Sequence, residues 1–120
     1  MTGSVGYHAG RVAEDVAERE YLGRNCRTLV RRWRGQSGEI DLILRDNDGV
    51  GVIFVEVKKS KSFARASTRL GRRQMDRICA SASEFLAGEP KGQLTDVRFD
   101  LALVNGVGQV HIIENAFTQA

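Results

Sequence analysis

Two apolar segments separated by a tight turn constrain the fold of this chain more than any other feature. Residues 38–44 and 52–58 are rich in Ile, Leu and Val, and the sequence Asp-Asn-Asp-Gly lies between them at residues 46–49. Asp, Asn and Gly form tight turns readily, so we predict a β-hairpin. Apolar residues occupy both odd and even positions of each segment, which predicts a sheet covered on both faces.

The predicted hairpin carries charged residues that a buried sheet has to accommodate. Side chains alternate between the faces of a strand, so Glu39 shares a face with Asp41, and Glu56 shares one with Lys58. If the strands pair, Asp41, Glu56 and Lys58 converge near one end of the sheet. Burial of two carboxylates and an ammonium group is costly unless they pair or hold a metal. These residues therefore predict either a structural ion pair with Lys58 or a metal site.

The rest of the chain divides into helical and extended patterns. We predict a frayed leader, two helices, three further strands and a mobile basic loop. The leader is residues 1–8, and the helices are residues 9–22 and 71–87. The further strands are residues 26–33, 97–104 and 109–113, and the loop is residues 59–69. The element order αβββαββ predicts an α/β fold, a central mixed β-sheet flanked by helices, in a single domain of residues 1–120.

Arginines interrupt the apolar residues of the predicted first strand. They are Arg27, Arg31, Arg32 and Arg34. Charged side chains that point outward are typical of a strand at the edge of a sheet, where they discourage pairing with another molecule. We therefore expect an edge strand with its arginines facing outward.

The composition narrows the class of protein. The net charge is +3 and the pI is about 9.2, which is compatible with binding to nucleic acid. No run of about 18 apolar residues and no signal peptide occur, so we expect a cytoplasmic protein without a membrane partner. Cys26 and Cys79 lie far apart and form no C-x-x-C motif, so we expect core residues rather than a disulfide or a zinc site.

Four short motifs resemble a known family. They are GEIDLI (residues 38–43), FVEVK (54–58), RFD (98–100) and ENAF (114–117). In this order and spacing they resemble the YraN-like family of small bacterial proteins, and the resemblance covers roughly residues 9–117. That family is similar to archaeal Holliday-junction resolvases and has the restriction-endonuclease-like fold of the PD-(D/E)XK superfamily. In that superfamily a strand acid, a hairpin turn and an acid–apolar–lysine sequence form the active site.

The resemblance implies a DNA endonuclease that uses Mg²⁺ or Mn²⁺. Asp41 and Glu56 would supply carboxylate ligands, which Mg²⁺ prefers, and the backbone carbonyl of Val57 would supply a third oxygen. Lys58 would stabilise the attacking water or the developing charge. Glu14 matches the helix acid that completes the site in resolvase-like nucleases, although an acid in a first helical turn is equally typical of a solvated residue.

Three further residues have secondary roles in this interpretation. Glu39 is an auxiliary acid on the face of Asp41. Members of the family often carry a lysine in the second helix, and this chain has Gln74 there, which can form hydrogen bonds but supplies no charge. Arg98 is expected to form a salt bridge with Asp100 or with another carboxylate.

A basic cluster next to the predicted site is the strongest sign of nucleic-acid binding. Its residues are Lys59, Lys61, Arg65, Arg69, Arg72 and Arg73. Few aromatic residues accompany them, so we expect contacts to the backbone of duplex or branched DNA rather than base stacking; a solvated basic face is the alternative. Three functions remain open: an endonuclease, a non-catalytic nucleic-acid-binding module and a protein-interaction domain. A homodimer and a monomer are equally compatible with the sequence.

Overall fold

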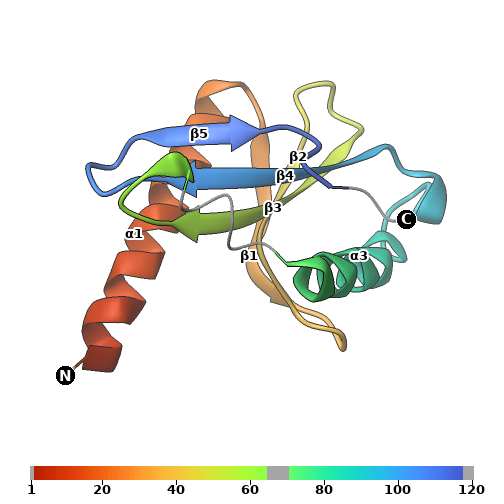
Figure 1. Ribbon diagram of the computed structural model, residues 1–120. Helices are drawn as coiled ribbons and strands as arrows, with labels where there is room; N and C mark the ends of the chain where they lie inside the picture. Colours follow the sequence, from red (N-terminus) through yellow and green to blue (C-terminus); the bar gives the residue numbers. More distant parts are fainter. Residues whose placement is uncertain (1, 65–70, 118–120) are drawn as a thin grey trace.

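The computed structural model describes the backbone of residues 2–64 and 71–117, and the side chains of these ranges from residue 11 onward (Figure 1). The elements follow the predicted order. They are α1 (Thr2–Gly23), β1 (Arg27–Arg34), β2 (Glu39–Arg45), β3 (Val52–Lys59), α3 (Arg72–Leu86), the short 3₁₀ helix η1 (Gly92–Leu94), β4 (Val97–Val104) and β5 (Val110–Ile113). The predicted α/β fold is confirmed, and the strands lie within one or two residues of their predicted bounds.

The beginning of α1 differs from the prediction. We expected a frayed leader over residues 1–8, but the helix begins at Thr2. The helical spacing of apolar residues starts only at Val12, so the small and polar residues before it give no sequence signal. Once a helix is nucleated, however, each added residue costs little, and the packed part of α1 can extend toward the N-terminus.

The five strands form one mixed sheet in the order β1-β2-β3-β4-β5. The β3–β4 pair is parallel, and the other three pairs are antiparallel. Parallel neighbours need a crossover connection, and α3 lies in the connection from β3 to β4. The predicted mixed sheet is therefore confirmed, with β1 at one edge as expected.

Helices cover both faces of the sheet, as the apolar pattern of the hairpin predicts (Figure 1). On one face, Ala17 and Tyr21 of α1 pack with the strand residues Leu42, Ile53 and Val55. On the other face, α3 packs against Phe54 of β3. Ile53 and Val55 thus face one core and Phe54 the other, as the alternation of side chains along a strand requires.

The two cysteines are buried and unpaired, one in each core, which confirms the prediction for Cys26 and Cys79. Within the described ranges, no helix combines the length and the apolar character that crossing a membrane requires.

The sheet opens between β2 and β3. Their ladder ends at the Leu42–Val55 pair, although β2 continues to pair with β1 as far as Glu39 and β3 continues to pair with β4 as far as Lys59. The two strands therefore separate directly before Asp41 and Glu56. This fork gives the charged ends of the strands room that a continuous sheet would not provide.

Candidate active site

The fork between β2 and β3 forms a polar pocket of about 450 Å³. Eight of the residues that the sequence singled out line it: Glu14, Glu39, Asp41, Glu56, Val57, Lys58, Lys59 and Gln74. The predicted convergence of Asp41, Glu56 and Lys58 at one end of the sheet is therefore confirmed. The pocket brings α1, both hairpin strands and the first turns of α3 together at this end.

Asp41 and Glu56 lie side by side in the pocket. The Val57 N–H donates a hydrogen bond of 2.8 Å to Asp41 Oδ2, and the Gln74 side-chain amide donates one of 2.7 Å to Glu56 Oε2. Glu56 is buried, with 4% of its surface exposed. Burial raises the pKa of Glu56 from its ordinary value of 4.5 to about 9, helped by the hydrogen bond and the negative charge of Asp41. Burial and Asp41 thus favour the protonated form of Glu56, and a cation could take the place of its proton.

Lys58 belongs to the same pocket but is not locked in an ion pair. Among the described residues it forms no salt bridge with Asp41 or Glu56, and its positive charge opposes the rise in the Glu56 pKa. The structural ion pair that the sequence left open is therefore absent from this part of the chain. Lys58 acts on the acids through its charge.

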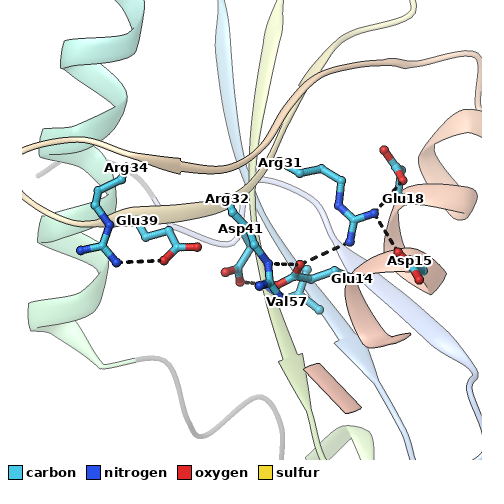
Figure 2. A network of polar contacts seen from close by, with 9 residues as sticks. All are labelled: Glu14, Asp15, Glu18, Arg31, Arg32, Arg34, Glu39, Asp41 and Val57. Atoms are coloured by element: carbon cyan, nitrogen blue, oxygen red, sulfur yellow. Dashed lines mark hydrogen bonds and ion pairs between the residues drawn. The ribbon is translucent and has the colours of Figure 1, made fainter. Parts of the chain in front are cut away.

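Glu14 reaches the pocket from α1 and is held by two arginines of β1 (Figure 2). Its Oε1 accepts a hydrogen bond of 2.8 Å from Arg32 Nε and a longer one of 3.4 Å from Arg31 Nη2. Arg31 also contacts Asp15 at 2.7 Å and Glu18 at 3.4 Å. Acids on one face of α1 thus attach the helix to the edge strand.

The expectation that the arginines of the first strand face outward is wrong for Arg31 and Arg32. Their side chains are only 32% and 29% exposed because they pair with the acids of α1. Arg34, by contrast, is 79% exposed and contacts Glu39 at 3.4 Å. The acids of α1 lie far from β1 in the sequence, so the strand pattern alone could not reveal the pairing.

Arg32 is a pocket residue that the sequence analysis missed. Its backbone has a φ of 53°, in the left-handed region that bulky residues rarely adopt. The only sequence signal is the doublet Arg31-Arg32, which breaks the alternation of the strand.

The predicted basic cluster divides into three parts. Lys59 lines the pocket. Lys61, at the start of the connection from β3 to α3, and Arg72 and Arg73, in the first turn of α3, are exposed. Arg65 and Arg69 lie outside the described residues. At the start of this loop Phe63 packs against the buried Leu101 and Leu103 of β4.

The donor atoms of the pocket suit a hard cation that keeps several waters. No group of three or more His, Cys, Asp or Glu side chains in the described ranges is arranged to hold a metal. Asp41 and Glu56 nevertheless supply two adjacent carboxylates, and the Val57 peptide lies beside Asp41. Mg²⁺ is commonly held by one or two carboxylates with water in its remaining positions, so this pair fits it.

Another buried acid lies outside the pocket. Asp100 of β4 has no exposed surface and accepts hydrogen bonds from Arg98 Nε (2.8 Å), from the Tyr21 hydroxyl (2.7 Å) and from the Asn115 N–H (2.9 Å). The predicted Arg98–Asp100 salt bridge is confirmed. Arg98 also contacts Glu114 at 3.4 Å, so the RFD and ENAF motifs meet in a structural cluster.

Comparison with known proteins gives a consistent result. The model of the uncharacterised protein family UPF0102 matches residues 13–104. A UPF0102 protein of Cereibacter sphaeroides strain ATCC 17029 is 62% identical over 117 residues, which are 98% of each chain. A UPF0102 protein of Ruegeria pomeroyi is 55% identical over 96% of this chain and 92% of its own length, and one of Dinoroseobacter shibae is 44% identical over 89% and 78%, respectively.

Proposed function

The chain belongs to the uncharacterised protein family UPF0102, and we propose that it is a metal-dependent endonuclease of the restriction-endonuclease-like superfamily that hydrolyses phosphodiester bonds of duplex or branched DNA. One observation carries the proposal. Two adjacent carboxylates, Asp41 and Glu56, share a polar pocket with Lys58 at a fork in the sheet. Nothing in the packing of the core requires such a costly group of charges.

Asp41 and Glu56, with the backbone carbonyl of Val57, are the ligands that we propose for Mg²⁺ or Mn²⁺. The raised pKa of Glu56 supports this role, because the pair of acids needs a positive charge between them once both are ionised. Such a cation, when bound, supplies charge stabilisation for the scissile phosphate and lowers the pKa of a water molecule.

Lys58 and Gln74 complete the proposed chemistry. The ammonium group of Lys58 stabilises the negative charge that develops on the phosphate oxygens. Gln74 orients Glu56 through its hydrogen bond of 2.7 Å. Glu39 lines the pocket as an auxiliary acid, and its contact with Arg34 keeps it at the rim.

We propose that the basic residues around the pocket contact the DNA backbone. Lys59, Lys61, Arg72 and Arg73 are exposed, so they can reach phosphates without a change in the core. We extend the proposal to Arg65 and Arg69 from their places in the sequence. Phosphate contacts give affinity without sequence specificity and weaken as salt is added.

A non-catalytic DNA-binding module is the second candidate, and Gln74 favours it. The side chain that reaches Glu56 from α3 is neutral, although members of the family that the motifs resemble often have a lysine there. A site without that charge could bind DNA and a cation without turnover.

Cleavage assays on branched, flap, duplex and single-stranded DNA with Mg²⁺, Mn²⁺ or EDTA test the proposal. We expect metal-dependent cleavage that Asp41→Asn and Lys58→Ala each reduce by at least about 100-fold, the usual loss when one charge-stabilising group is removed. Asp96→Asn and Lys91→Ala are matched controls, since both residues are exposed and outside the pocket. Salt-sensitive binding without cleavage would support the module, and the absence of both would support the protein-interaction domain.

A further inference from the structure

We propose that Glu14 is a positioning residue: it holds the guanidinium group of Arg32 in the pocket, where Arg32 contacts a phosphate of the DNA backbone. The inference rests on the proposed function and deepens it by naming a phosphate-binding side chain of the site. It gives the helix acid a role different from the metal-ligand role that the resemblance implies.

The contacts of Glu14 are the first argument. Its side chain is only 10% exposed, and its Oε1 already accepts hydrogen bonds from Arg32 and Arg31 at 2.8 and 3.4 Å (Figure 2). A metal ion on this carboxylate would have to lie beside two guanidinium groups that are permanently charged, which is electrostatically unfavourable. The arrangement is suited to holding arginine.

The backbone conformation of β1 at Arg32 also supports the inference. Successive side chains of a regular strand point to opposite faces, yet Arg31 and Arg32 both reach Glu14. The left-handed φ of 53° at Arg32 breaks the alternation. Unfavourable backbone conformations of this kind persist where the surrounding structure enforces them, and they gather at functional sites. Here the result is a guanidinium group in the pocket.

The position of Arg32 in the sheet, opposite Asp41, supports the inference as well. The pairs Arg31–Leu42 and Trp33–Ile40 flank it, so Arg32 lies opposite Asp41. Among the described residues, four acidic side chains line the pocket, and the basic ones are Arg32, Lys58 and Lys59. A phosphate that enters among these acids needs cations around it, and Arg32 comes from β1 whereas the two lysines come from β3.

The chemistry of arginine makes both contacts possible at once. The guanidinium group carries five N–H donors in a planar fork. The Nε–H of Arg32 is one of these donors, and it donates to Glu14. Because a guanidinium group binds phosphate in a geometry that an ammonium group cannot reproduce, the identity of the side chain matters as well as its charge.

Two binding measurements, neither of which needs cleavage, test the inference. The first is the affinity for a short DNA duplex in EDTA, and the second is the affinity for Mn²⁺ without DNA, followed by electron paramagnetic resonance. We expect three variants, Glu14→Gln, Arg32→Gln and Arg32→Lys, each to weaken duplex binding about tenfold, which is the equivalent of one charge-assisted hydrogen bond. The same variants should leave the affinity for Mn²⁺ unchanged. Glu14→Gln combined with Arg32→Gln should be no weaker than Arg32→Gln alone, because Glu14 acts through Arg32.

Arg27→Gln is the matched control, since it removes one exposed arginine of the same strand that lies outside the pocket. Its duplex affinity should stay within about twofold of the wild type. Arg32→Lys keeps the charge at this position, so it serves as the second variant if Glu14→Gln does not fold.

Three results would overturn the inference. They are a loss of Mn²⁺ affinity in Glu14→Gln with normal duplex binding, normal duplex binding in Arg32→Gln and Arg32→Lys, and a wild-type protein that binds no duplex. Failure of the proposed nuclease activity can be distinguished from failure of this inference. If the protein binds DNA through Arg32 but does not cut it, the inference still holds.

Discussion

Two buried acids on neighbouring strands have opposite surroundings. Asp100 of β4 faces α1 and accepts hydrogen bonds from Tyr21, Arg98 and the Asn115 backbone, all supplied by the protein. Glu56 of β3 faces α3, and its neighbours in the pocket include a second acid, Asp41. In the Asp100 cluster the acid is paired with hydrogen-bond donors and a cation, whereas in the pocket burial and the charge of Asp41 oppose the ionisation of Glu56. Burial alone therefore does not identify a functional acid; the nature of its partners does.

The first prediction breaks the Asp100 cluster. Asp100→Asn removes a fully buried carboxylate that Arg98, Tyr21 and the Asn115 N–H all contact, so we expect the free energy of unfolding to fall by about 3 kcal/mol. Chemical denaturation measures the change. Asp76→Asn removes an exposed partner of Arg72 and should cost no more than about 0.5 kcal/mol. Equal losses in the two variants would contradict the structural role of Asp100.

The second prediction changes the other acid and has the opposite sign. Glu56→Gln removes a carboxyl group whose ionisation is opposed by burial and by Asp41, and glutamine resembles the protonated form. At about pH 8 we expect the free energy of unfolding to rise by at least about 2 kcal/mol, while cleavage is lost. Denaturation without added metal, compared with Asp100→Asn, checks the sign. A destabilised Glu56→Gln protein would mean that Glu56 belongs to the architecture in the same way as Asp100.

The third prediction concerns pH. The pKa of Glu56 is raised in the folded state from 4.5 to about 9, so folding favours its protonated form. The stabilising contribution is complete below pH 4.5 and is lost as the pH rises toward 9. Wild-type stability should therefore fall across this range relative to Glu56→Gln, by about 1–2 kcal/mol between neutral and mildly alkaline pH. Parallel stability curves for the two proteins would show that the Glu56 carboxyl does not titrate in this way.

The fold was largely predictable because its signals are local. The turn sequence at residues 46–49 and the alternation along residues 38–44 and 52–58 depend only on nearby residues, and they also brought Asp41, Glu56 and Lys58 to one end of the sheet. The helix at residues 2–8 was missed because it lacks the apolar spacing that marks a helix.

The two polar networks were predictable only in part because their partners are distant in sequence. The Arg98–Asp100 pair spans two residues and could be foreseen, whereas Tyr21 is 79 residues away from Asp100. Arg32 was missed for a different reason. Its entry into the pocket depends on one left-handed backbone angle, and no residue preference predicts that angle for arginine.

The last prediction removes one hydrogen-bond donor from each acid. Tyr21→Phe takes a hydroxyl from Asp100 in the closed core, where water has no room to replace it, so we expect a loss of about 1.5 kcal/mol. Gln74→Ala takes an amide from Glu56 at the edge of the open pocket, where water can substitute, so the cost should be about 0.5 kcal/mol.

Thermal unfolding and DNA cleavage, measured together on the two variants, separate the roles further. Tyr21→Phe should keep wild-type cleavage despite its larger loss of stability, because its hydroxyl faces the opposite side of the sheet from Glu56. Gln74→Ala should lose activity because Glu56 is no longer oriented. The reverse pattern would mean that the Asp100 cluster controls the site, and that complete hydrogen bonding does not separate structural acids from functional ones in this protein.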